Sequence, residues 1–126
     1  MKVTEAAFIG YPVTDIARAR EFYENVLGLP LTMDHEIGDM PGKHWIEYDL
    51  GNVTLAISNT WEPSGQGGPS VALEVDSLEE VMAKLKAANV TIHAENIVTP
   101  VCEFALITDP DGNSIIIHKR KADCGH

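Results

Sequence analysis

The sequence predicts an α+β fold made of two tandem βαβββ modules, because it repeats itself about 61 residues apart. In each half, a strand-like run leads into a helical pattern, a short segment ends that pattern, and a Gly-Asn turn later joins two strand-like runs. The corresponding segments are Val13-Thr14-Asp15-Ile16 and Val75-Asp76-Ser77-Leu78, Leu27-Gly28-Leu29 and Ala88-Asn89-Val90, and Gly51-Asn52 and Gly112-Asn113. Two copies of so small a unit must pair to bury a shared core, and a ligand cavity commonly forms where sheets meet. The repeat therefore predicts a small-molecule site.

The first module, about residues 5–60, is expected to contain one helix and four strands. Asp15 is a good N-cap, and apolar residues recur at helical spacing until Gly28, which supplies a left-handed end. Gly51-Asn52 predicts a tight hairpin between the last two strands. The predicted strands span 7–13, 29–37, 44–50 and 53–58, with a loop at 38–43.

The second module, about residues 70–121, repeats this order. Ser77 and Glu80 form a predicted capping box, and Asn89 ends the helix that they begin. The predicted strands span 70–75, 91–95, 102–108 and 113–119. We expect one domain over residues 1–126, with a Gly- and Pro-rich linker at 61–69 and a loose tail at 122–126.

Composition excludes several classes of function. The chain has 126 residues, of which 44% are hydrophobic, and a net charge of −10. Nucleic-acid binding depends on neutralising phosphates with Lys and Arg, so an acidic chain is a poor candidate, and no apolar run is long enough to span a membrane. Cys102 is expected to be buried and Cys124 to be a free thiol in the tail. The absence of a basic segment followed by an apolar run predicts a cytoplasmic protein.

Strand alternation assigns side chains to the two faces of each sheet, because residues two apart share a face. The face away from the helices is expected to mix aromatic, small and ionisable residues, as ligand pockets do. In the first module the predicted outer face carries Trp45, Glu47, Asp49, Thr54, Ala56 and Ser58, opposite Ile46, Tyr48, Leu55 and Ile57. In the second it carries Ser70, Ala72, Glu74, Glu103, Ala105, Ile107, Ser114, Ile116 and His118, opposite Val71, Leu73, Phe104, Leu106, Ile115 and Ile117.

These features resemble the vicinal oxygen chelate superfamily, which contains glyoxalases, bleomycin resistance proteins and ring-cleaving dioxygenases. The resemblance covers about residues 8–119. It is carried by Val13-Thr14-Asp15-Ile16, Phe22-Tyr23, Leu27-Gly28-Leu29, Val75-Asp76-Ser77-Leu78 and Asp109-Pro110-Asp111-Gly112-Asn113. It implies a glyoxalase/bleomycin resistance-type fold, in which a mixed sheet curls into a cup that a homodimer often completes.

Metal-using members place His or Glu at four cup positions, which correspond here to Phe8, Ala56, Ser70 and Ile116. Alkyl and phenyl side chains supply no lone pairs to a divalent ion, so we expect neither a metal nor another cofactor. A rearranged metal site is the alternative, and it would use Glu47, Glu74, Glu103 and His118.

Two pairs of side chains are candidates for ligand contacts. Trp45 and Glu47 suit a cationic or aromatic ligand; the alternative is a Trp at a dimer interface and a Glu in water. His118 and Glu103 are expected to be cross-strand neighbours that act as a general base or clamp; the alternative is an ordinary surface pair. Glu74 is expected near the rim of the cup, where it adds negative potential or lies in water.

The leading hypothesis is a protein that binds a small organic molecule without chemistry, as antibiotic-sequestering relatives do. Its predicted ligand-binding residues are Phe8, Trp45, Glu47, Ala56, Ser70, Glu74 and Ile116, with His118 and Glu103 as the predicted catalytic residues if turnover occurs. The alternative is a glyoxalase-type lyase or isomerase that uses a non-standard metal site or the Glu–His pair as a proton shuttle. A purely structural or regulatory module is a third possibility, since fold alone assigns no function.

Overall fold

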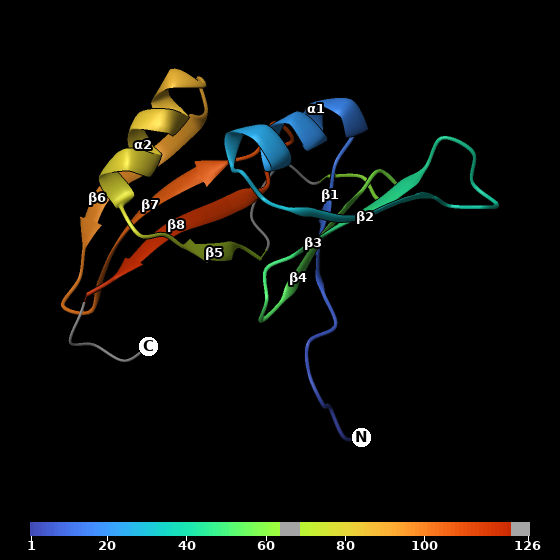
Figure 1. Ribbon diagram of the computed structural model, residues 1–126, viewed down its shortest axis with the longest axis horizontal. Coiled ribbons are helices and arrows are strands. Elements are labelled where there is room, and N and C mark those ends of the chain that lie inside the picture. Colours follow the sequence, from blue (N-terminus) through green and yellow to red (C-terminus); the bar gives the residue numbers. More distant parts are fainter. Residues whose placement is uncertain (64–68, 122–126) are drawn as a thin grey trace. The chain divides into compact units, whose positions relative to one another are not determined.

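The structure, a computed structural model, describes residues 1–63 and 69–121 (Figure 1). The chain divides into two compact units, Met1–Gly65 and Gln66–His126. Each unit contains a four-stranded sheet with one parallel and two antiparallel pairs of neighbours. The predicted α+β class with two βαβββ modules is confirmed.

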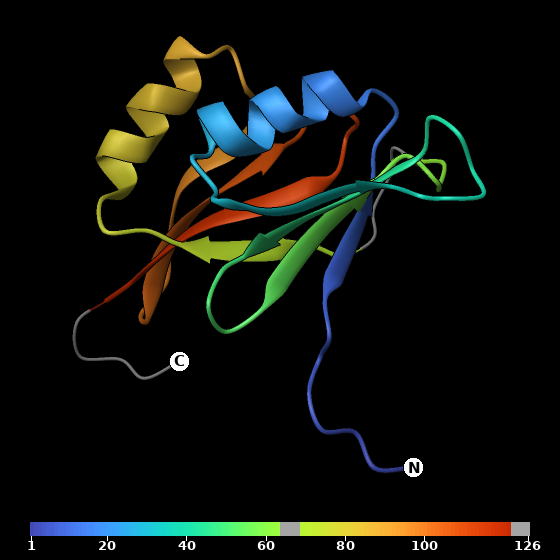
Figure 2. The same ribbon diagram turned by 45° about the vertical axis from the view of Figure 1, so that its right-hand side comes forward.

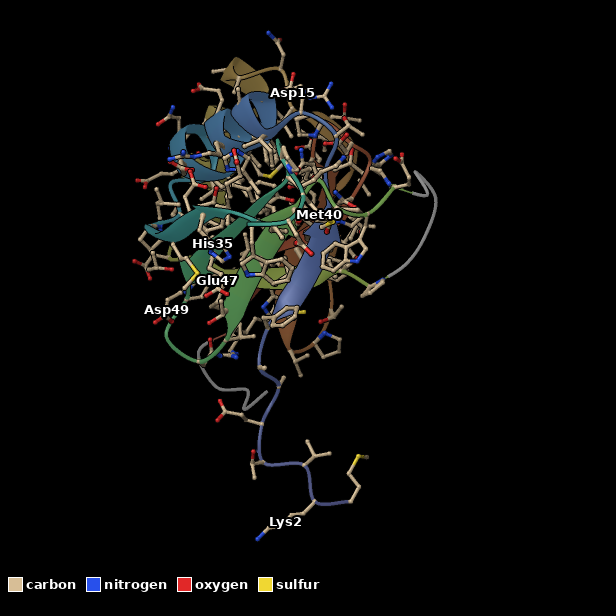
Figure 3. All side chains as sticks on the ribbon, turned by 90° about the vertical axis from the view of Figure 1, so that its right-hand side faces the viewer. Lys2, Asp15, His35, Met40, Glu47 and Asp49 are labelled. Carbon is tan, nitrogen blue, oxygen red and sulfur yellow. The ribbon has the colours of Figure 1, made fainter. Side chains whose placement is uncertain are left out.

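The sheet of the first unit has the strand order β1-β4-β3-β2 (Figure 2). Its strands are β1 (Ile9–Pro12), β2 (Leu31–Glu36), β3 (His44–Asp49) and β4 (Thr54–Ser58). β1 runs parallel to β4, whereas β3 is antiparallel to both of its neighbours. The first strand starts at Ile9 rather than at the predicted residue 7, and the preceding segment, with Lys2 near its end, extends away from the sheet (Figure 3).

The helical segment of the first unit differs from the single α-helix that was predicted. α1 (Ile16–Arg20) begins at the Asp15 N-cap, whose carboxylate accepts a hydrogen bond from the Arg18 N–H at 3.0 Å. A π-helix, η1 (Glu21–Val26), then follows, in which the Leu27 N–H reaches the Phe22 carbonyl. π-Helical turns insert an extra residue into a helix and re-aim the side chains that follow. Gly28 ends the segment with φ 73°, as predicted.

The core of the first unit lies between this helical segment and one face of the sheet. Tyr23 stacks on Tyr48 with their ring centroids 5.9 Å apart, and both side chains are fully buried. Ile46 pairs with Ile57, and Tyr48 pairs with Leu55, across β3 and β4. The predicted faces of these two strands are confirmed, because Glu47 then lies opposite Ala56 on the other face.

The second unit repeats the order β5-β8-β7-β6. It consists of β5 (Val71–Glu74), α2 (Leu78–Ala87), β6 (Thr91–Val98), β7 (Cys102–Thr108) and β8 (Ser114–Arg120). The Ser77 hydroxyl caps α2 by accepting a hydrogen bond from the Glu80 N–H at 3.2 Å, which is one of the two hydrogen bonds of the predicted capping box. β6 runs three residues beyond the predicted end, past a residue at positive φ, Asn96. Cys102 is buried, as predicted.

The predicted faces of β7 are wrong. Thr108 pairs with Ser114, so five residues, 109–113, connect β7 to β8. The Asp109 carboxylate accepts the N–H groups of Asp111 and Asn113 at 2.9 and 2.8 Å, which holds this loop together. The predicted pairing required a connection with an even number of residues, and one residue more or less exchanges the two faces of a strand.

The consequence is that Ala105 and Ile107, not Phe104 and Leu106, join Ile115 and Ile117 in the core. Residues 64–68 of the predicted linker, and the predicted tail at 122–126 with Cys124, lie outside the described residues. Within the described ranges, no helix is both long and apolar enough to cross a membrane.

Candidate functional site

Three aromatic side chains gather on the outer face of the first unit, the face away from η1. The Phe8 and Trp45 rings meet edge to face with centroids 5.0 Å apart, and Trp45 meets Trp61 in the same way at 5.5 Å. We call these three side chains the aromatic cluster. Phe8 and Trp61 are 45% and 43% exposed, so the cluster presents apolar ring surface to its surroundings. Large exposed aromatic surfaces of this kind commonly mark binding sites.

Trp61 is a site residue that the sequence analysis assigned to the linker. The chain that leads to it is fixed by Ser58, whose buried hydroxyl donates to the His44 carbonyl at 2.7 Å, and by Asn59, which accepts the His44 N–H at 2.8 Å. The Trp61 ring then lies over Gly10, where an added Cβ would stand 3.2 Å from two ring carbons. A lone glycine inside a predicted strand, here Gly10, often marks such a close approach, and it is the sequence feature from which a contact above this position could have been predicted.

Glu47 lies beside the aromatic cluster. Its carboxylate accepts a hydrogen bond from the Trp45 indole N–H at 2.8 Å. Among the described residues, no Lys, Arg or His lies within ion-pair distance of this carboxylate, although Arg20, Lys86 and other cations of the chain have acidic partners. Within residues 1–63 and 69–121, the half-buried Glu47 carboxylate therefore has no cationic side chain as an ion-pair partner.

The neighbouring strands complete this face. Across β2 and β3, His35 lies opposite Trp45 and Met33 lies opposite Glu47. Ala56 lies opposite Glu47 on the other side and opposite Gly10 in β1. Both residues at the centre of this face are small, and the Trp61 ring covers Gly10. The predicted site residues Phe8, Trp45, Glu47 and Ala56 are therefore brought together here.

The second unit brings together an acid and an imidazole. Glu74 lies opposite His118 across β5 and β8, and its Oε1 is 2.6 Å from His118 Nδ1. The other oxygen, Oε2, accepts the backbone N–H of Arg120 at 2.8 Å. Partial burial opposes ionisation of Glu74, but these two hydrogen bonds outweigh it and lower the pKa of the carboxyl below its usual value. Glu74 is thus a carboxylate held in place at both oxygens.

The predicted pairing of His118 with Glu103 is wrong. Glu103 lies opposite Lys119, on the face that carries Ala105 and Ile117, whereas His118 lies opposite Phe104. This follows from the five-residue connection between β7 and β8, which places Phe104 and Leu106 on the outer face. For the same reason Phe104 and Leu106 were not among the predicted site residues, and Glu74, the partner of His118, was predicted only as a separate rim residue.

The remaining predicted residues of this unit share the outer face. Ile116 lies opposite Ala72 in β5 and opposite Leu106 in β7. The Ser70 hydroxyl donates to the Ser114 hydroxyl, at the other end of the strand pair from Glu74. The face thus combines polar ends with an apolar centre.

A polar network on the helix side of the first unit has a structural role. Arg20 forms two hydrogen bonds with the Glu24 carboxylate, at 2.7 and 3.1 Å, and a third with Asp34 at 2.8 Å. The Tyr48 hydroxyl donates to Glu24 at 2.9 Å. The Arg20 hydrogen bond lowers the pKa of Glu24, whereas burial, and then the bond to Glu24, raises the pKa of Tyr48. The network ties η1 to β2 and β3.

One family model matches most of the chain. The model of the Glyoxalase/Bleomycin resistance protein/Dioxygenase superfamily matches residues 6–117. No curated protein matches the chain.

Solved structures with the same fold include TnmS3, described as an antibiotic binding protein from Streptomyces sp. CB03234. It is 22% identical with a TM-score of 0.78, over 96% of this chain and 99% of that one. Glyoxalase I of Leishmania major is 17% identical with a TM-score of 0.74, over 93% and 87%. The fosfomycin resistance protein FosX of Mesorhizobium loti is 11% identical with a TM-score of 0.72, over 93% and 92%.

The residues at the four positions where the resemblance to the family predicts metal ligands do not fit a metal. Phe8 packs its ring on Trp45, Ala56 and Ile116 are alkyl side chains, and the Ser70 hydroxyl is bonded to Ser114. Zinc and the other divalent transition metals in proteins are held mainly by imidazole, thiolate and carboxylate donors. Nor do any three His, Cys, Asp or Glu side chains within 1–63 and 69–121 form a group that could hold an ion. The side chains at the four expected ligand positions therefore do not supply a donor set for such an ion.

Proposed function

Because the chain belongs to the glyoxalase/bleomycin resistance protein/dioxygenase superfamily, we propose that it binds a small aromatic or cationic organic molecule without transforming it. The observation that carries the proposal is the unbalanced Glu47 carboxylate beside the half-exposed aromatic cluster. The description of TnmS3 as an antibiotic binding protein supports binding as a role of this fold.

The chemistry of the first unit favours a flat cation over an anion or an aliphatic molecule. Phe8 and Trp61 offer exposed ring faces and edges, on which a flat ligand gains about 0.5–1.5 kcal/mol beyond its buried area. A cation on an indole face gains about 0.5–2 kcal/mol, depending on how far it is desolvated. A cation also supplies the charge partner that Glu47 lacks among the described residues, whereas an anion would be repelled by it.

A pair of flat probes of different charge tests the proposal. Proflavine and acridine have the same three fused rings, but at pH 8 proflavine is a cation and acridine is neutral. We expect proflavine to bind about tenfold more tightly, as one charge-assisted hydrogen bond predicts, measured by isothermal titration calorimetry and by quenching of tryptophan fluorescence. Bleomycin is a third probe, of the drug type that the family name suggests.

Variants assign the effect to the site. Glu47→Gln should abolish the preference for proflavine, and Trp45→Leu should weaken both probes. Glu79→Gln, which removes the same charge from the exposed first turn of α2, is the matched control and should leave both affinities unchanged. Equal binding of proflavine and acridine to the unmodified protein, or no heat and no quenching with any probe, would refute the proposal.

A second candidate function is a lyase or isomerase reaction, and the 2.6 Å contact between Glu74 and His118 is the observation that favours it. A carboxylate that orients a histidine is a common arrangement for a general base. Such a reaction exchanges a ligand proton with solvent, so turnover in deuterated water should place deuterium in the recovered molecule. Elemental analysis of protein purified without chelators tests the variant of this candidate that uses a non-standard metal site.

We also propose that the protein is a cytoplasmic homodimer. The resemblance to the family, in which a homodimer often completes the cup, supports this proposal. Light scattering at several concentrations measures the mass directly, and a monomer at all of them would contradict this part of the proposal.

A further inference from the structure

Met33 and His35 place two metal-binding side chains on one face of the edge strand β2. This strand lies at one end of the strand order of its sheet, and all six of its residues are exposed. Met33 and His35 are two residues apart, so they share the outer face, with their Cα atoms about 7 Å apart. Because methionine is unbranched and flexible, the thioether of Met33 can reach an ion that the imidazole of His35 also holds.

The second unit builds the same strand pair without these donors. Equivalent N–H to carbonyl bonds directly after β1 and β5 align the two sheets. The strand registers then place Ala94 of β6 at the position of Met33. In the same way, Ile97 takes the position of His35. Alanine and isoleucine supply no donor atom, so the fold requires neither a thioether nor an imidazole here.

Both donors of β2 are accessible. Met33 is 43% exposed, and His35 is exposed as well. Among the described residues, no side chain forms a hydrogen bond or an ion pair with the His35 ring, whereas His44 in the neighbouring strand contacts Asp34 at 3.1 Å. An incoming ion therefore has no protein contact of the His35 ring to displace.

The opposite strand supplies a carboxylate. Glu47 in β3 lies directly opposite Met33, and residues that face one another across an antiparallel pair have Cβ atoms about 4.5–5.5 Å apart. The hydrogen bond from the Trp45 indole N–H goes to Oε2 of Glu47. In the part of the chain that the structure describes, no Lys, Arg or His forms an ion pair with this carboxylate. A cation held by the thioether therefore meets a negative charge that offsets its own.

The types of donor determine the class of ion. Hard ions such as Mg²⁺ and Ca²⁺ prefer oxygen ligands, for which a thioether is a poor substitute. Zinc sites use several imidazole, thiolate or carboxylate ligands, and no group of three such side chains is present within the described residues. Thioether sulfur favours Cu(I), and imidazole also binds copper. A univalent soft ion accepts few ligands, and one carboxylate balances its charge.

We infer that Met33 and His35 form a binding site for a soft univalent metal ion, Cu(I) or its analogue Ag(I), with Glu47 as the charge partner. This site goes beyond the proposed function, since it takes a different class of ligand and neither donor belongs to the aromatic cluster. Binding and release leave the oxidation state of the ion unchanged, so the site needs no redox partner.

Silver nitrate in chloride-free buffer at pH 7.5 is the probe, because Ag(I) is not oxidised in air. The full chain carries Cys102→Ala and Cys124→Ser, which remove thiols that would compete for the ion, with ¹³C-labelled methionine methyl groups and ¹⁵N-labelled histidine rings. We expect one equivalent of Ag(I) to shift the NMR signals of the Met33 methyl and of one His35 ring nitrogen together. The methyl of Met40, which is also exposed, should keep its position. Zn(II) should leave the Met33 methyl signal in place.

Variants assign the ion to the two donors. Met33→Leu keeps the size and apolar character of the side chain, and both Met33→Leu and His35→Phe should weaken Ag(I) binding at least about tenfold in isothermal titration calorimetry. Met40→Leu and His93→Gln remove an exposed thioether and an exposed imidazole elsewhere, and they should leave the affinity unchanged.

Four results would overturn the inference. They are equal Ag(I) affinities of Met33→Leu and Met40→Leu, a shift of the Met33 methyl without a shift of His35, an equal shift of that methyl with Zn(II), and no shift at concentrations on the order of 1 mM.

The metal site and the proposed function fail separately. Met33→Leu leaves Glu47 and the aromatic cluster in place, so it should weaken Ag(I) binding while proflavine still binds more tightly than acridine. Ag(I) binding without a preference for proflavine would refute only the binding of flat cations. A preference for proflavine without Ag(I) binding would refute only the metal site.

Discussion

Replacing Gly10 by alanine tests whether the aromatic cluster depends on the close approach of Trp61 to β1. A Cβ at this position would lie 3.2 Å from the Trp61 Cη2 and Cζ3 atoms and 3.5 Å from Phe8 Cε2. Carbon atoms pack best at about 3.5–4.0 Å, so the Phe8 contact is ordinary, but Trp61 must move outward by a few tenths of an ångström. Nothing else in the strand has to shift.

The expected effects on stability and on the site are different. Alanine in a strand is about 0.5–1 kcal/mol better than glycine, which offsets the cost of moving a 43% exposed ring. The free energy of unfolding should therefore change by less than about 1 kcal/mol. Displacing Trp61 should nevertheless weaken its edge-to-face contact with Trp45 and lower the affinity for proflavine several-fold.

Urea denaturation measures the free energy of unfolding. Near-ultraviolet circular dichroism reports the packing of the aromatic rings, and calorimetric titration measures the affinity for proflavine. Gly38→Ala is the matched control, since a Cβ at Gly38 meets nothing within 4 Å. If Gly10→Ala left both the aromatic dichroism and the proflavine affinity unchanged, the packing of Trp61 on β1 would not organise the site. A loss of several kcal/mol of stability would equally contradict the reasoning.

Three further predictions concern the scaffold. The pKa of Glu24 is lowered in the folded protein, so the ionised carboxylate stabilises the fold above its ordinary pKa of 4.5, and this stabilisation is lost as the pH falls through the folded value. In urea titrations, the stability difference between the unmodified protein and Glu24→Gln should therefore shrink below pH 4.5. Ser77→Ala removes the side-chain cap of α2 and should cost about 1 kcal/mol by thermal unfolding, whereas Ser77→Asp should cost little. Asp109→Ala removes the acceptor of the 109–113 loop and should cost about 2–3 kcal/mol in the same assay, and a cost below that of Ser77→Ala would show that the loop does not depend on this carboxylate.

Residues that face the helices could be predicted from sequence because hydrophobic periodicity encodes them directly. Ile46, Tyr48, Leu55 and Ile57 alternate with polar or small residues, and a hairpin with a Gly-Asn turn fixes their register. The same method failed at β7, where Cys102 through Ile107 is apolar except at Glu103, so alternation does not distinguish the faces. There the register depends on loop length, and loop length depends on the hydrogen bonds of one aspartate.

The candidate site was predictable only in part, for a related reason. Trp45 and Glu47 lie two apart in one strand, so local alternation placed them together, and the structure agrees. The Glu74–His118 pair joins strands 44 residues apart in the sequence, and Trp61 reaches Gly10 from beyond the end of β4. Contacts of this kind depend on register and on the path of connecting segments, which composition and periodicity do not encode.

Comparison of the two repeated units distinguishes the features that both units share from the outer-face residues that differ between them. Both units keep the N–H to carbonyl bond made by Val13 and Val75, and both bury apolar side chains on the helix side. On the outer faces, corresponding positions differ: Trp45 matches Phe104, and Glu47 matches Leu106, while Ser58 matches His118. Since either set of residues supports the same strand order, exchanging these side chains should cost little stability and change ligand preference instead. Replacing Leu106 by glutamate, to copy the acid of the first unit, should therefore give a folded protein whose free energy of unfolding in urea changes by less than about 1 kcal/mol.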